Sequence, residues 1–155
     1  MDWGIKVLVL GGLLKRISNF DMSDLKQRII FQKTTYLLQA FGLYLEYEFS
    51  WYVHGPYSTE LAKDGFTLVQ IYEDVPTVKL AGEEETKFRD FIKFLGDRKT
   101  DTDWLEQLSC VHFLRLLYPK KTKEEILEEV LQHESHFTKE QCEEAWRYLE
   151  KFNLL

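Results

Sequence analysis

The chain has few of the residues that cross-link a fold or break its helices and strands. Its 155 residues include two cysteines, three prolines and eight glycines. Cys110 and Cys142 form no CxxC pair, which excludes a disulfide scaffold and is typical of a protein in a reducing compartment. The low content of proline and glycine excludes collagen-like and low-complexity chains. We therefore expect an ordinary globular protein of the cytoplasm.

Long hydrophobic runs are also missing. The longest uncharged run near the N-terminus, from Val7 to Leu14, lies between Lys6 and Lys15 and is far shorter than the roughly 20 residues of a membrane span. The chain begins with Met1-Asp2, without the basic segment of a secretory signal. We expect neither a membrane segment nor a signal peptide.

The motifs that mark common active sites are absent as well. There is no G-x-S-x-G elbow, catalytic-cysteine signature or phosphate-binding loop, and Gly11-Gly12 does not fit the dinucleotide fingerprint G-x-G-x-x-G. A zinc site typically needs two close pairs of cysteine or histidine. The residues considered for such a site lack that spacing: Cys110, His112, His133, His136 and Cys142. We expect no enzyme, and no catalytic residue, metal ligand or cofactor.

Apolar and aromatic residues are plentiful. Hydrophobic residues make up 45% of the chain, and its 11 Phe, 8 Tyr and 4 Trp give an aromatic content of 15%. A chain of this length removes about 68–70% of its unfolded surface from water, which is enough for a real core. This composition excludes intrinsic disorder and indicates one domain, spanning residues 1–155.

Charge is unevenly distributed along the chain. The net charge is −6, yet residues 1–42 carry +3 and residues 83–155 carry −5. An acidic chain is at a disadvantage in binding phosphates, which is driven by Lys and Arg. The basic residues of the first third either form a local patch or belong to the solvated faces of two amphipathic helices. They include Lys15, Arg16, Lys26, Arg28 and Lys33.

Hydrophobic spacing and capping residues predict a mainly α-helical fold with a short two-stranded β element. The expected helices lie at about 3–18, 23–41, 58–68, 83–95, 101–117, 122–131 and 138–152, and the expected strands at 49–53 and 75–80. Ser23 is the expected N-cap of the second helix, and His54-Gly55-Pro56 is expected to end the first strand. Thr122-x-x-Glu125 and Thr138-x-x-Gln141 are capping boxes. We predict a winged-helix-like part at 1–96 and a helical part at 101–155.

Two sequence segments resemble a known family. The residues that carry the resemblance are Phe31-Gln32-Lys33-Thr34-Thr35-Tyr36-Leu37-Leu38-Gln39, Gly42, Phe49, Trp51, Tyr52, His54-Gly55-Pro56-Tyr57-Ser58 and Leu61. They are similar to the Panacea domain and closer still to YwgA-like proteins. The C-terminal stretch from Phe137 to Leu155 also resembles the latter. The resemblance implies a helical, winged-helix-like domain, and Panacea proteins are associated with neutralising toxins.

The resemblance also implies a functional surface. Its residues are Gln32, Lys33, Tyr36, Trp51, His54, Gly55, Pro56 and Tyr57. The alternative interpretation is structural, with Tyr36 and Trp51 as core aromatics and Gly55-Pro56 as a tight turn.

Two functions follow from these observations. The first is a non-enzymatic regulatory or protein-binding module, such as an antitoxin or an adaptor, because aromatic residues are frequent in interface hot spots. The second is a winged-helix DNA-binding transcriptional regulator that uses the basic N-terminal helices. The segment 58–66, which would be the recognition helix, carries Lys63 against Glu60 and Asp64. Because such helices usually read DNA with Arg, Lys, Asn or Gln, nucleic-acid binding is disfavoured.

Overall fold

A computed structural model describes residues 4–18 and 20–155 and shows a mainly helical fold with one small sheet. The helices are α1 (Gly4–Leu14), α2 (Leu25–Ala40), α3 (Thr59–Ile71), α4 (Gly82–Leu95), α5 (Thr102–Leu117), α6 (Lys123–His133) and α7 (Lys139–Lys151). Short 3-10 turns, η1 (Tyr72–Asp74) and η2 (Gly96–Arg98), follow α3 and α4. Strands β1 (Ser50–Tyr52) and β2 (Gly55–Tyr57) form the antiparallel sheet. The predicted fold class, mainly α with a short β element, is confirmed.

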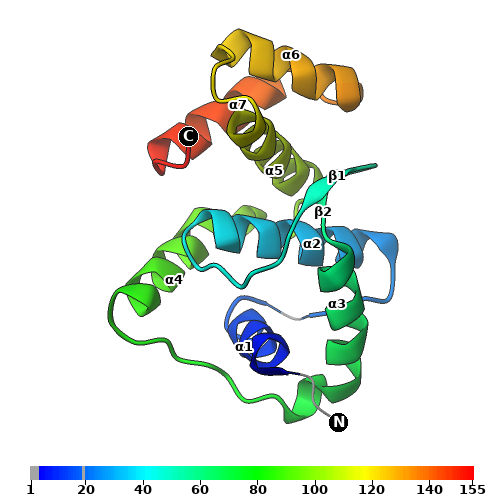
Figure 1. Ribbon diagram of the computed structural model, residues 1–155, viewed down its shortest axis with the longest axis vertical. Coiled ribbons are helices and arrows are strands. Elements are labelled where there is room, and N and C mark those ends of the chain that lie inside the picture. Colours follow the sequence, from blue (N-terminus) through cyan, green and yellow to red (C-terminus); the bar gives the residue numbers. More distant parts are fainter. Residues whose placement is uncertain (1–3, 19) are drawn as a thin grey trace.

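Helix α5 is the centre of the C-terminal half. It packs against α2, β2, α6 and α7, and in Figure 1 the helices α5, α6 and α7 lie together above α2. On the other side of α2, helix α1 packs against α3, and α3 in turn packs against α2. The buried apolar residues of these helices form one continuous cluster. No described helix is long and apolar enough to cross a membrane.

The helix ends follow local capping chemistry. Both predicted capping boxes are present, Thr122 with Glu125 and Thr138 with Gln141. The predicted N-cap of α2 is wrong by one residue, because the carboxylate of Asp24 accepts the Gln27 N–H at 2.8 Å. The carboxylate of Asp21 accepts the backbone N–H and the hydroxyl of Ser23 instead, so that Ser23 belongs to the turn before the helix.

The predicted second strand at 75–80 is wrong. This segment has no strand partner among the described residues and runs along α1, where the Val78 N–H donates to Gly12 O at 3.3 Å. A Cβ added at Gly12 would lie 2.3 Å from the Val78 side chain. Gly12 therefore lowers the helix propensity of α1 but allows the chain to approach it closely. Helix α1 also ends at Leu14, short of the predicted position 18, and its predicted start at Trp3 lies outside the described residues.

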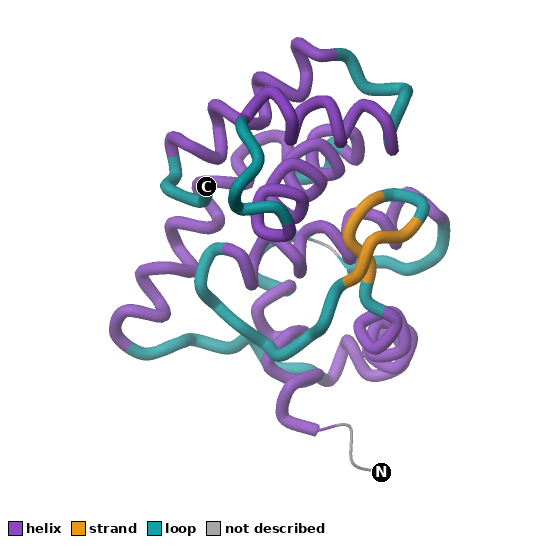
Figure 2. The backbone as a smooth tube through the Cα atoms, turned by 45° about the horizontal axis from the view of Figure 1, so that its top comes forward, coloured by secondary structure: helices purple, strands orange, loops and turns teal. Residues whose placement is uncertain are grey.

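The sheet partner of β1 follows it directly in the chain. β1 and β2 pair as a tight hairpin, with Trp51 opposite Pro56 and Tyr52 opposite Gly55 (Figure 2, orange). The turn lies at Val53-His54, so the prediction that Gly55-Pro56 forms a tight turn is wrong. Pro56 is tolerated in β2 because a strand in a two-stranded sheet has an edge that needs no N–H donor.

Candidate functional site

Two adjacent side chains of α2 hold the hairpin in place. The Gln32 side chain donates to Ser58 O at 2.9 Å and accepts the Ser58 N–H at 3.0 Å. The Lys33 ammonium donates to Pro56 O at 2.6 Å. The structure thus brings together the Gln-Lys and Gly-Pro-Tyr-Ser segments that the sequence singled out, through bonds from side chains to backbone.

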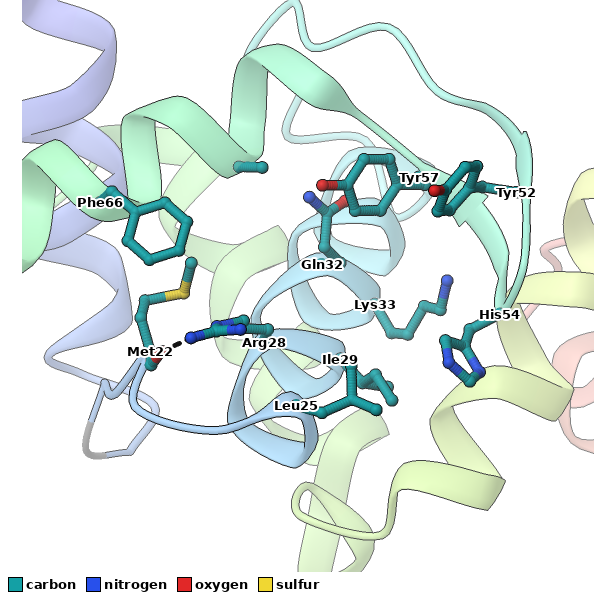
Figure 3. Close-up of a pocket in the computed structure, with 11 residues that line it drawn as sticks. Met22, Leu25, Arg28, Ile29, Gln32, Lys33, Tyr52, His54, Tyr57 and Phe66 are labelled. Atoms are coloured by element: carbon teal, nitrogen blue, oxygen red, sulfur yellow. Dashed lines mark hydrogen bonds between the residues drawn. The ribbon is translucent and has the colours of Figure 1, made fainter.

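A pocket of about 240 Å³ opens between α2, α3 and the hairpin. Figure 3 shows its lining side chains: Met22, Leu25, Arg28, Ile29, Gln32, Lys33, Tyr52, His54, Tyr57, Ala62 and Phe66. Four of the eight predicted site residues, Gln32, Lys33, His54 and Tyr57, are among them. Most of the others are apolar, so the pocket favours an apolar occupant.

Two of the remaining predicted residues are aromatic and lie away from the pocket. Tyr36 is buried, and its hydroxyl lies 2.7 Å from His112 Nδ1. Trp51 is half-buried and its ring centroid lies 5.1 Å from that of His133. Both side chains pack with the core, in keeping with the structural interpretation of these two aromatics.

The last two, Gly55 and Pro56, act through the backbone. Gly55 has a φ of +89°, and a Cβ added there would lie 2.5 Å from Cys110 Sγ. Only glycine satisfies both the backbone angle and the close approach to α5. Pro56 is buried and offers its carbonyl oxygen to Lys33.

Behind the hairpin lies a group of ionisable residues that we call the buried charge cluster: Lys33, His54, Glu106, Glu134 and His136. His54 Nδ1 lies 3.5 Å from Glu106 Oε1, and His136 Nε2 lies 3.9 Å from Glu106 Oε2. On the other side of its ring, His136 Nδ1 lies 3.8 Å from Glu134 Oε2. Glu106 and Glu134 are 4% exposed and Lys33 is 1% exposed.

Burial works against the charges of this cluster. It lowers the pKa of Lys33 to about 8, although nearby Glu106 opposes the shift. It raises the pKa of Glu106 to about 7, against the attraction of Lys33. It also raises the pKa of Glu134 and lowers the pKa of His54. The low dielectric of the interior penalises each charged form; an opposite charge nearby limits the penalty for Lys33, Glu106 and Glu134, whereas the positive charge of Lys33 adds to the lowering for His54.

Sequence reasoning missed Glu106 and Glu134. Their positions, in α5 and directly after α6, look like ordinary polar positions of amphipathic helices. The one available signal was that the helix at 101–117 is apolar nearly all round, as a central buried helix should be. A glutamate on such a helix has no solvated face to occupy.

Exposed apolar side chains surround the mouth of the pocket. Leu25 is 58% exposed, Tyr52 60% and Phe66 50%. We call these three residues, with the neighbouring exposed Val53 and Val69, the apolar rim.

The basic residues of the N-terminal third do not form a shared ridge. Lys33 is buried, Lys15 donates to Val75 O, and Arg16 binds both carboxylate oxygens of Glu85. Of the five basic residues Lys15, Arg16, Lys26, Arg28 and Lys33, only Lys26 and Arg28 are exposed. Because intramolecular partners occupy the others, few of these cations are left to contact a phosphate backbone.

Comparisons with protein-family models, curated proteins and solved structures found no match. A function for the chain must therefore be inferred from the pocket and its rim.

Proposed function

We propose that the chain is a non-enzymatic protein-binding module of the cytoplasm, whose pocket accepts one large apolar side chain of a partner protein. The observation that supports this proposal most directly is a largely apolar pocket whose lining includes the exposed Leu25, Tyr52 and Phe66 of the apolar rim. Arg28, beside the pocket, binds an acidic group next to that side chain. The resemblance to Panacea and YwgA-like proteins supports a regulatory role of this kind, such as that of an antitoxin or an adaptor.

The size of the pocket favours an anchoring side chain over a small-molecule ligand. Pockets that enclose drug-sized ligands or cofactors have volumes of roughly 300–1,000 Å³. This pocket, at about 240 Å³, falls below that range. Single apolar or aromatic anchors that fill pockets carry much of the binding energy in protein interfaces.

The surroundings of the pocket also favour a macromolecular partner. Ala62, Phe66 and Val69 are spaced four and three residues apart on α3 and share one face of it. Phe66 and Val69 are exposed on that face, Tyr52 and Val53 are exposed on the hairpin, and Phe66 and Tyr52 line the same pocket. A contiguous exposed apolar surface with polar residues around it is typical of an interaction site.

The charge at the pocket indicates an acidic partner segment. Arg28 donates through Nε to Met22 O at 2.9 Å, and its guanidinium lies 5.5 Å from the Phe66 ring. Within residues 4–18 and 20–155, no carboxylate lies within ion-pair distance of Arg28. Its terminal nitrogens can therefore donate to a carboxylate of the partner.

DNA binding through a winged-helix-like part, 1–96, is the weaker proposal. On α3, Glu60 pairs with Lys6 at 2.8 Å and Asp64 accepts from the Tyr47 hydroxyl at 2.7 Å. Both acids lie on the helix that would have to read DNA, and their negative charges oppose contact with phosphates.

Selection from a library of displayed random peptides on the immobilised full-length protein tests the proposed function. We expect the enriched peptides to carry a large apolar residue close to Asp or Glu. Their binding should be lost in Phe66→Ser, which removes the rim aromatic, and weakened in Arg28→Gln, which removes the cation.

A matched control is Leu116→Ser. Leu116 is 65% exposed but lies on α5, outside the pocket lining. Peptides that bind Phe66→Ser as tightly as the wild type, or a selection that enriches none, would count against the proposal.

A further inference from the structure

Three side chains of the buried charge cluster converge from different parts of the C-terminal half. Glu106 lies on α5, Glu134 directly follows α6, and His136 lies in the loop before α7. One carboxylate oxygen from each glutamate and one imidazole nitrogen of His136 all lie within 4.8 Å of one another. Helix α5 and the loop between α6 and α7 thus bring two oxygen donors and one nitrogen donor close together.

Glu134 supplies a second, independent observation. Its side chain is 5% exposed, and Glu134 Oε1 has no hydrogen-bond partner in the part of the chain that the structure describes. Buried polar atoms are almost always satisfied, and a buried carboxylate oxygen is especially costly to leave without a donor or a cation. The unsatisfied oxygen belongs to the same carboxylate that faces His136.

The protein's own cations do not balance these carboxylates. The Lys33 ammonium attracts both Glu106 and Glu134, but it donates its hydrogen bond to Pro56 O. Asp103 adds further negative charge near Glu106. The histidines, His54 and His136 at the cluster and His133 near Glu134, add no positive charge when they are neutral. Among residues 4–18 and 20–155, one ammonium therefore faces two buried carboxylates.

We propose that Glu106, Glu134 and His136 bind a divalent transition-metal ion, with Zn²⁺ as the ion that suits them best and water completing its coordination. Mg²⁺ and Ca²⁺ prefer all-oxygen sites, whereas a histidine nitrogen combined with carboxylates suits zinc. This site is independent of the proposed binding of a partner protein.

The donor atoms lie further apart than in a formed tetrahedral site and must close in on the ion. Zinc bonds to nitrogen and oxygen of about 2.0–2.1 Å place tetrahedral ligand atoms about 3.4 Å apart. The three donor atoms lie within 4.8 Å of one another, and the closest approaches are 3.8 Å from His136 Nδ1 to Glu134 Oε2 and 3.9 Å from His136 Nε2 to Glu106 Oε2. These two approaches use different nitrogens of His136, whereas an ion binds only one of them, so the ring must turn and the carboxylates must move towards the ion. The His136 side chain is 53% exposed, which allows its movement and gives the ion a path from solvent.

Calorimetric titration of the EDTA-treated, dialysed full-length protein with ZnCl₂ tests the site. We expect one ion to bind per chain. Glu134→Gln keeps the shape of the side chain and removes its charge, and His136→Ala removes an exposed ligand with little effect on packing. Both should weaken binding by at least about tenfold, since even the outer partners of metal ligands are worth that much. His54→Ala should weaken binding less, because His54 lies outside the three converging side chains.

His133→Ala is the matched control for non-specific binding by surface histidines. His133 is 48% exposed and pairs with Glu129, outside the three converging side chains. It should leave zinc affinity unchanged. Circular dichroism checks that each variant folds, and titration with CoCl₂ adds a visible spectrum that reports nitrogen and oxygen coordination directly. A wild-type protein that shows no saturable binding, or a folded His136→Ala variant that binds zinc as tightly as the wild type, would overturn the proposal.

Discussion

The Lys33 ammonium, buried to 1% exposure on α2, donates a 2.6 Å hydrogen bond to the carbonyl oxygen of Pro56 in β2. Lysine is almost never fully buried unless its charge is paired. Here the side chain spans from the central helix to the hairpin, with Glu106 and Glu134 as its nearby negative charges. The same residue therefore fixes the pocket wall and partly neutralises the buried charge cluster.

Replacing Lys33 by methionine keeps most of the buried volume and removes the charge. We expect Lys33→Met to lower the free energy of unfolding by about 3 kcal/mol, because it leaves the Pro56 carbonyl and a buried carboxylate without their partner. Chemical denaturation at pH 7 measures this loss.

The exposed Lys26, on the same helix, is the control for this substitution. Lys26→Met should change the free energy of unfolding by less than about 0.5 kcal/mol. If Lys33→Met were as stable as Lys26→Met, the ammonium would not be holding the hairpin.

Gly55 tests the close approach of the hairpin to α5. Gly55→Ala adds a methyl group 2.5 Å from Cys110 Sγ at a φ of +89°. We expect a loss of about 3 kcal/mol, of which roughly 1–2 kcal/mol is backbone strain and the rest is the clash with the sulfur. Thermal or chemical unfolding of the variant measures the sum.

Two further variants separate these causes. Gly82 has a φ of +56° with nothing within 4 Å of an added Cβ, so Gly82→Ala should show only the strain, about 1 kcal/mol. In a Cys110→Ala background the sulfur is absent, so Gly55→Ala should lower the free energy of unfolding by less than it does in the wild type, because only the backbone strain remains. Equal costs in both backgrounds would show that the sulfur plays no role.

The helices could be predicted from the sequence because their signals are local. The boxes at Thr122 and Thr138 act within four residues, and both form as predicted. The hairpin and the segment at 75–80 could not be predicted in the same way. Apolar alternation marks an extended chain but does not say what it pairs with, and Val78 pairs with Gly12 of α1 across 66 positions.

The residues of the candidate site also divide into those that the sequence singles out and those whose position depends on tertiary packing. Gln32 and Lys33 were singled out from the sequence, and the structure places both against the hairpin. Glu106 and Glu134 were not, because their burial depends on how α5 and α6 pack in three dimensions. A buried charge is visible in a sequence only when its helix has no polar face left for it.

The Arg16–Glu85 ion pair should make stability depend on acid pH. Arg16 donates to both oxygens of Glu85, at 2.8 and 2.5 Å, and these hydrogen bonds lower the pKa of Glu85 to about 2 from its ordinary value of 4.5. A carboxylate whose pKa is lower in the folded state stabilises the protein above the unfolded pKa and loses this effect as pH falls. Glu85→Gln should therefore have a lower melting temperature than the wild type at pH 7, and the difference should shrink between about pH 4.5 and 2.

Arg89 offers a control for this pair, because it contacts the same carboxylate at 3.1 Å but is 64% exposed. Arg89→Gln should change the melting temperature much less than Glu85→Gln at pH 7. A difference between wild type and Glu85→Gln that stayed constant from pH 7 to pH 2 would contradict the role of the ion pair.

His112 should cause a second loss of stability, at a higher pH. Burial lowers its pKa from 6.5 to about 4 in the folded protein, where its neutral ring faces the Tyr36 hydroxyl. A histidine buried in its neutral form stabilises the fold above pH 6.5, and this contribution, about 3 kcal/mol, disappears as pH falls to 4.

His112→Phe should cost about 1 kcal/mol at pH 7, because the Tyr36 hydroxyl loses its partner. It should nevertheless be more stable than the wild type near pH 4, where phenylalanine takes up no proton. Urea unfolding at pH 7 and pH 4 measures the free energy of unfolding of both proteins. The control Tyr36→Phe keeps His112 and should therefore keep the steep pH dependence of the wild type. A constant difference in stability between wild type and His112→Phe at the two pH values would contradict the prediction.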